Sequence, residues 1–61
     1  MSQTQILDII RSDAAEFGTN PVTFLLDQAT ASRFDGDLDT ARSALGHARR
    51  LRDLGEGPRL P

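Results

Sequence analysis

Few side chains in this sequence have the types and spacing that chemistry requires. Its 61 residues contain no cysteine and no lysine, so neither a thiolate nucleophile nor a lysine Schiff base is available. The one histidine, His47, is predicted to lie exposed on the polar face of a helix, opposite Leu45. A chain this short offers no cleft that would desolvate and orient a Ser–His–Asp arrangement. We therefore predict a non-enzymatic protein that uses no cofactor.

Three carboxylates at alternate positions resemble the opening of a calcium-binding loop: Asp35, Asp37 and Asp39. Such a loop also needs a later glycine and a bidentate glutamate near its twelfth position, and this sequence has neither in place. The end of one helix and the N-cap of the next explain the same residues. No metal site is predicted.

The arginine cluster Arg49, Arg50 and Arg52 is the one segment that suggests contact with nucleic acid. Cations near a helix C-terminus are also favoured by the helix dipole, which explains the cluster without a ligand. The net charge of -2 and the lack of a polar recognition face argue against DNA. Weak nucleic-acid binding through these arginines is kept as an alternative.

Charge is unevenly distributed along the chain. Acids dominate residues 1–39, where they are Asp8, Asp13, Glu16, Asp27, Asp35, Asp37 and Asp39, and arginines dominate from residue 40 onward. The first residues carry no basic region ahead of an apolar run, and no apolar stretch approaches the ~20 residues that span a bilayer. We expect a cytoplasmic protein without membrane contact.

Local signals predict three helices, over about residues 3–17, 21–34 and 38–54, with a flexible tail over 55–61. The start signals are a capping box at Ser2 and Gln5, Asn20 before Pro21, and Asp37. The stop signals are Gly18, Gly36 and Gly55. No alternating pattern typical of strands competes. The sequence therefore predicts an all-α protein with one domain over residues 1–61.

Helical spacing predicts which faces are buried. The first helix has an apolar stripe of Ile6, Leu7, Ile10, Ala14 and Phe17, and the third has a band of Leu38, Ala41, Ala44, Leu45, Ala48 and Leu51. Ile9 falls outside the first stripe, beside Asp13 and Glu16, at the rim of the core or on an exposed contact surface. Arg42, Arg49 and Arg52 flank the band, and their aliphatic stems can cover its edge.

The middle helix is apolar on two sides. Val22, Leu25, Leu26 and Ala29 share one face, and Phe24, Ala31 and Phe34 lie on nearly the opposite one. Such a helix needs two neighbours, which predicts a small three-helix bundle with antiparallel sequential helices. The two phenylalanines are expected in its core, with self-association or a partner surface as the alternatives.

The segment from Gly36 to Ala41, continued by Leu45 and Ala48, resembles the turn and second helix of a tetratricopeptide repeat, with Ala29 at its usual small position. The resemblance covers about half of the chain. The sequence departs from the repeat at its aromatic positions, here Leu25, Ser32 and Leu38, and no second copy follows. The resemblance implies a helical hairpin and no more.

Surplus apolar surface on a small acidic bundle predicts a protein–protein interaction module, a regulator or inhibitor that docks on a larger complex. One version is a phage-type inhibitor, such as an anti-CRISPR protein, whose acidic surface occupies a basic channel. The candidate partner-binding residues are Asp8, Ile9, Asp13, Glu16, Phe24 and Phe34. The alternatives are a homo-oligomer through the second apolar face of the middle helix, and the nucleic-acid binder.

Overall fold

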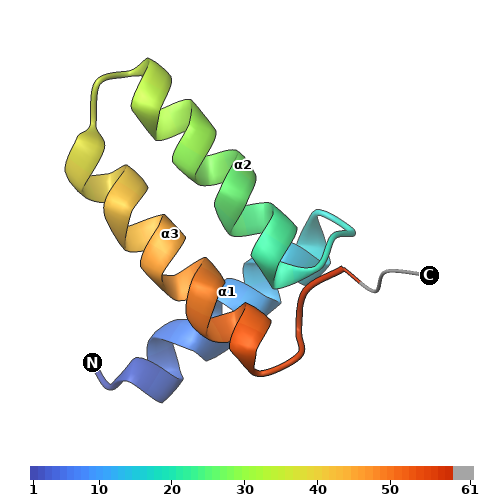
Figure 1. Ribbon diagram of the computed structural model, residues 1–61. Coiled ribbons are helices and arrows are strands. Elements are labelled where there is room, and N and C mark those ends of the chain that lie inside the picture. Colours follow the sequence, from blue (N-terminus) through green and yellow to red (C-terminus); the bar gives the residue numbers. More distant parts are fainter. Residues whose placement is uncertain (59–61) are drawn as a thin grey trace.

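The computed structural model describes residues 1–58, which form three α-helices joined by short turns. These are α1 (Gln3–Glu16), α2 (Pro21–Phe34) and α3 (Leu38–Asp53). The helices α2 and α3 run in opposite directions side by side as a hairpin, and α1 crosses this hairpin at a steep angle, so the predicted antiparallel arrangement holds for α2 and α3 (Figure 1). The predicted all-α three-helix bundle is confirmed, and each predicted helix boundary agrees to within one residue.

Each helix begins at a side chain that accepts a backbone hydrogen bond from the first turn. Ser2 Oγ accepts from the Gln5 amide at 3.2 Å, Asn20 Oδ1 from the Thr23 amide at 2.8 Å, and Asp37 Oδ1 from the Thr40 amide at 3.1 Å. These amides have no partner inside the helix. Caps that are local in sequence therefore determine where the helices start.

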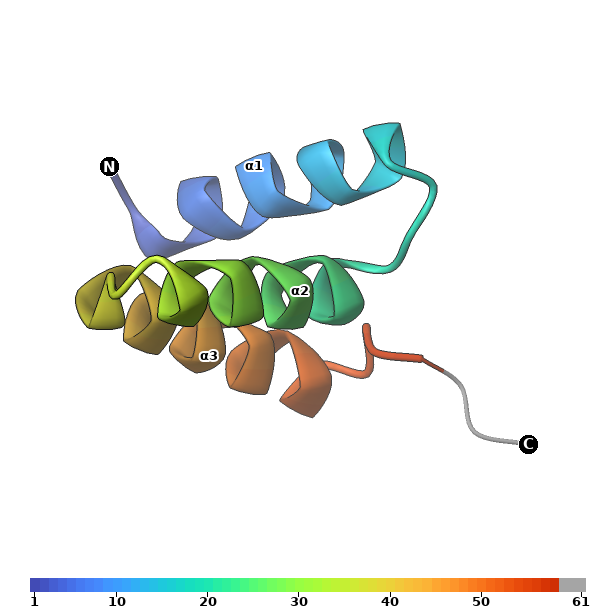
Figure 2. The ribbon, with the colours of Figure 1, turned by 90° about the horizontal axis from the view of Figure 1, so that it is seen from above.

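The helices pack as two layers, with α1 lying across one face of the α2–α3 hairpin (Figure 2). One cluster of buried side chains draws on all three helices: Leu7, Ile10, Val22, Leu25, Ala29, Ala44, Ala48 and Leu51. Contact between α2 and α3 is more extensive than contact between α1 and α2. Small residues on the facing sides of α2 and α3 explain this difference, because alanines allow two helices to approach closely.

Several residues that the helical pattern assigned to the core are exposed. Phe17, Leu26, Leu38 and Leu45 are all on the surface, and Phe34 is 90 % exposed. The core interpretation is therefore wrong for Phe34, because the last residue of α2 extends beyond the cluster. Phe24 is half-buried and packs against the core. Only one face of the hairpin is covered by α1, so the apolar stripes of α2 and α3 are wider than their cover.

Two glycines should respond in opposite ways to alanine. Gly36 ends α2 with φ +79°, whereas Gly46 lies inside α3, and neither has an atom within 4 Å of an added Cβ. Gly36→Ala is expected to lower the free energy of unfolding by about 1 kcal/mol, because a left-handed backbone strains an L residue. Gly46→Ala should raise it by about 0.5 to 1 kcal/mol. Urea titration measures the free energy of unfolding of both variants. Equal changes in the two would contradict the backbone conformations described for Gly36 and Gly46.

Candidate functional site

An open groove runs along the α2–α3 hairpin and consists of two hollows that meet at Leu45. The first is lined by Val22, Leu26, Leu45, Ala48, Arg49 and Arg52. The second is lined by Arg33, Leu38, Ala41, Arg42 and Leu45. Every lining residue comes from α2 or α3, so the groove belongs to the hairpin alone. We refer to these residues together as the hairpin groove.

The hairpin groove lies on the side of the hairpin that α1 leaves uncovered. The covered side has a hollow of its own, where Ile10 of α1 lies beside Leu25, Gln28, Ala44 and His47. On a helical wheel of α3, Leu38 and Leu45 lie on one flank of the alanines that face α2, and Ala44 and Leu51 lie on the other. The two faces of the hairpin are therefore both apolar, and one of them has no partner in the described chain.

The hairpin groove has a floor of small residues and walls of leucine. Ala41 and Ala48 are buried at its base. Leu26, Leu38 and Leu45 are between 40 and 58 % exposed, although each belongs to an apolar stripe. A small floor between exposed walls lets another helix approach closely, because side chains of the incoming helix can enter between the leucines.

Four arginines border the hairpin groove: Arg33, Arg42, Arg49 and Arg52. Within residues 1–58, the ion pairs are those that Arg11 forms with Asp8 and Glu56, so the groove arginines have no acidic partner there. A guanidinium group presents a planar fork of donors that suits a carboxylate. The groove thus combines an apolar centre with a positively charged rim.

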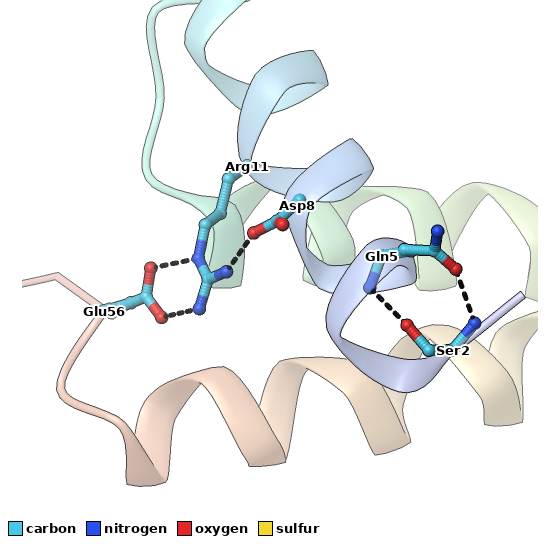
Figure 3. A network of polar contacts seen from close by, with 5 residues as sticks. All are labelled: Ser2, Gln5, Asp8, Arg11 and Glu56. Carbon is cyan, nitrogen blue, oxygen red and sulfur yellow. Dashed lines mark hydrogen bonds and ion pairs between the residues drawn. The ribbon is translucent and has the colours of Figure 1, made fainter.

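A second charged arrangement, around Arg11, joins α1 to the residues after α3 (Figure 3). Its Nε and Nη2 donate to the two carboxylate oxygens of Glu56, both at 2.6 Å, and its Nη1 donates to Asp8 Oδ1 at 2.7 Å. The hydrogen bonds from Arg11 lower the pKa of Glu56. The hydrogen bonds to Glu56 are the largest cause of a raised pKa for Arg11, and the bond to Asp8 raises it further. This arrangement is a structural tie between distant parts of the chain.

Asp37 also has a shifted pKa, and its role as a helix cap explains the shift. Hydrogen bonds from the Thr40 hydroxyl, at 2.6 Å from Oδ2, and from the Thr40 amide lower the pKa of Asp37. Asp37 acts here as the N-cap of α3, as predicted. In the part of the chain that the structure describes, no group of three or more histidine, cysteine or acidic side chains is placed to hold a metal ion.

The residues predicted to bind a partner do not come together at one place. On α1, Asp13 and Glu16 are exposed, Ile9 is 48 % exposed, and Asp8 is engaged by Arg11. On α2, the ring of Phe24 lies 5.7 Å from that of Phe17, whereas Phe34 stands alone at the far end of the helix. Of the arginine cluster, Arg49 and Arg52 line the hairpin groove and Arg50 does not.

Sequence reasoning missed two features of the surface. The helical pattern does not predict the hairpin groove, because it places Leu26, Leu38 and Leu45 in the core. The width of the apolar band on the third helix is a signal for it, since one neighbouring helix cannot cover so wide a band. Glu56 belongs to the predicted flexible tail over 55–61, of which 59–61 lie outside the described residues, and no local pattern indicates its pairing with Arg11, 45 positions away. His47, expected to be exposed, is half-buried.

None of the helices over residues 1–58 has the length and apolar character that a membrane crossing requires. Comparison of the chain with family models, with curated proteins and with solved structures finds no match. Function must therefore follow from the geometry of the chain itself.

Proposed function

We propose that this protein is a non-enzymatic interaction module, a small regulator that docks on a larger protein through the hairpin groove. The observation that carries the proposal is the row of exposed leucines on the uncovered face of the hairpin, between arginines that have no acidic partner within residues 1–58. Contiguous apolar surface with a polar rim is typical of protein-binding sites, and arginine is enriched in them.

The energetics of the hairpin groove also support binding. Leu26, Leu38 and Leu45 each keep about half of their residue surface in contact with water. Covering that surface would contribute on the order of 1 kcal/mol for each leucine, because full burial of such a side chain is worth about twice as much. The arginines at the rim would add orientation and specificity.

The other candidate surfaces have weaker support. The acidic surface of α1, which suggested an inhibitor of a basic channel, has Asp8 already held by Arg11. The homo-oligomer required a continuous second face on α2, but Phe24 packs against the core while Phe34 stands apart. Nucleic-acid binding would use Arg49, Arg50 and Arg52, but Arg50 lies outside the groove, whose centre is leucine and alanine.

Affinity capture with matched variants tests the proposal. Wild-type protein, Leu45→Asp and Ile9→Asp are immobilised, and bound proteins of the source cell are cross-linked and identified. Leu45 and Ile9 are similarly exposed, but only Leu45 lies in the hairpin groove. We expect the same specific protein on wild type and Ile9→Asp, and at least a tenfold loss on Leu45→Asp. Equal capture by Leu45→Asp, or no specific protein on wild type, would contradict the proposal.

A further inference from the structure

We infer that the occupant of the hairpin groove is an amphipathic helix of a partner protein, with an aliphatic seam flanked by carboxylates spaced two turns apart. This inference rests on the proposed function and adds the chemistry of the partner. Three observations lead to it: the way α1 occupies the opposite face, the spacing of the arginines, and the charge of the chain's own outer surfaces.

The first observation is that the hairpin already binds one amphipathic helix. On the covered face, α1 inserts Leu7 and Ile10, which are spaced as neighbours on one helix face. The uncovered face offers the same kind of surface, a shallow channel between two antiparallel helices with alanines at its base. A second helix placed there would complete a four-helix arrangement, in which each face of the hairpin is covered once.

The second observation gives the positions of the charges. Arg42 and Arg49 are seven residues apart on α3, which is about two turns and roughly 10.5 Å along the axis at 1.5 Å per residue. Side chains at this separation share one face of a helix. An antiparallel or parallel helix lying along α3 would meet both arginines if its own acids were also seven residues apart. Arg33 and Arg52 border the groove as further partners for carboxylates.

The third observation is that α1 of a second copy would be a poor occupant, while pairing of two grooves would bring their arginine rims together. The acidic helix of the chain is α1, but its buried aliphatic residues are already used, and its outer face offers Ile9 as its one large aliphatic side chain. A single isoleucine cannot fill a groove with three exposed leucines. A phosphate backbone would satisfy the arginines but would leave the leucines in water. An acidic amphipathic helix satisfies both.

A displayed library of amphipathic helices tests this chemistry. The library fixes a leucine seam and varies the flanking positions among Glu, Lys, Gln and Ala, and binders are selected on wild-type protein and counter-selected on Leu45→Asp. We expect Glu to be enriched at flanking positions seven residues apart. The most enriched peptide and a twin with Lys in place of Glu are then compared by fluorescence anisotropy. The Glu peptide should bind at least tenfold more tightly than its Lys twin. This difference in affinity should shrink as the salt concentration increases.

Charge-reversed variants show whether the arginines are responsible. Arg42→Glu/Arg49→Glu should weaken the Glu peptide at least tenfold and strengthen its Lys twin, whereas Arg50→Glu, which lies outside the groove, serves as the matched control. Each of four results would overturn the inference: enrichment of Lys, equal affinity for the two peptides, tighter binding of a labelled DNA duplex, or dimerisation in light scattering that Leu45→Asp abolishes.

The outcomes also separate this inference from the proposed function. If selected helices bind without a charge preference, the inference fails while the docking function stands. If no helix depends on Leu45, the docking function fails as well.

Discussion

Replacing Ile10 with aspartate is expected to unfold the protein. Ile10 is 8 % exposed and belongs to the cluster that joins α1 to the hairpin. An unpaired carboxylate at that position would lose its hydration, at an effective cost of several kcal/mol. A single core in a chain of this size supplies only about 3 to 5 kcal/mol of net stability, so the cost is as large as the whole reserve. Circular dichroism should show a large loss of helical signal at 25 °C.

The neighbouring residue provides a matched control for this change. Ile9 differs from Ile10 only in its position on the helix, and it is 48 % exposed. Ile9→Asp should therefore keep the helical signal and lower the free energy of unfolding by only about 1 to 1.5 kcal/mol, because about half of this residue is already exposed. If Ile9→Asp unfolds the protein while Ile10→Asp does not, α1 faces the hairpin with a different side from the one described.

Leu51→Ala is expected to lower the free energy of unfolding by about 2 to 5 kcal/mol. Leu51 is 0 % exposed and is the largest fully buried side chain among the described residues. The change removes buried methyl groups and leaves a cavity that the surrounding helices fill only in part. Urea titration followed by circular dichroism measures the effect, provided that the variant is folded without denaturant.

Leu54 is the control for Leu51, because it lies one turn later and is 58 % exposed. Leu54→Ala should lower the free energy of unfolding by much less, by about 1 kcal/mol or under, since more than half of this residue is already exposed. Similar losses in the free energy of unfolding would show that Leu51 and Leu54 are equally buried, which contradicts the packing described here for the end of α3.

The sequence predicted the helices well because their ends depend on neighbouring residues. Asn20 caps α2 through the amide of Thr23, three positions on, and Gly36 ends α2 through its own backbone conformation. Such signals act within one turn, so they can be found without any knowledge of tertiary contacts. The fold class follows from them together with the short connections between helices.

The hairpin groove and the Arg11 tie could not be predicted in the same way. Helical spacing groups Leu45 with Leu51, and the packing of the helices against one another decides that Leu51 is buried while Leu45 remains exposed. Likewise, Arg11 and Glu56 lie 45 positions apart, and nothing in either neighbourhood indicates the other. Both features depend on how the layers cross, which a periodic pattern of one helix does not specify.

The pair of Arg11 with Glu56 is a noncovalent connection between two distant segments of this cysteine-free chain. It joins two segments that enclose most of the sequence, as a disulfide often does in small domains. Unlike a disulfide, this bridge is indifferent to reducing agents, and it is weakened by dissolved ions because both side chains are partly open to water. The strength of this connection between the two ends of the helical domain therefore depends on ionic strength and not on redox state.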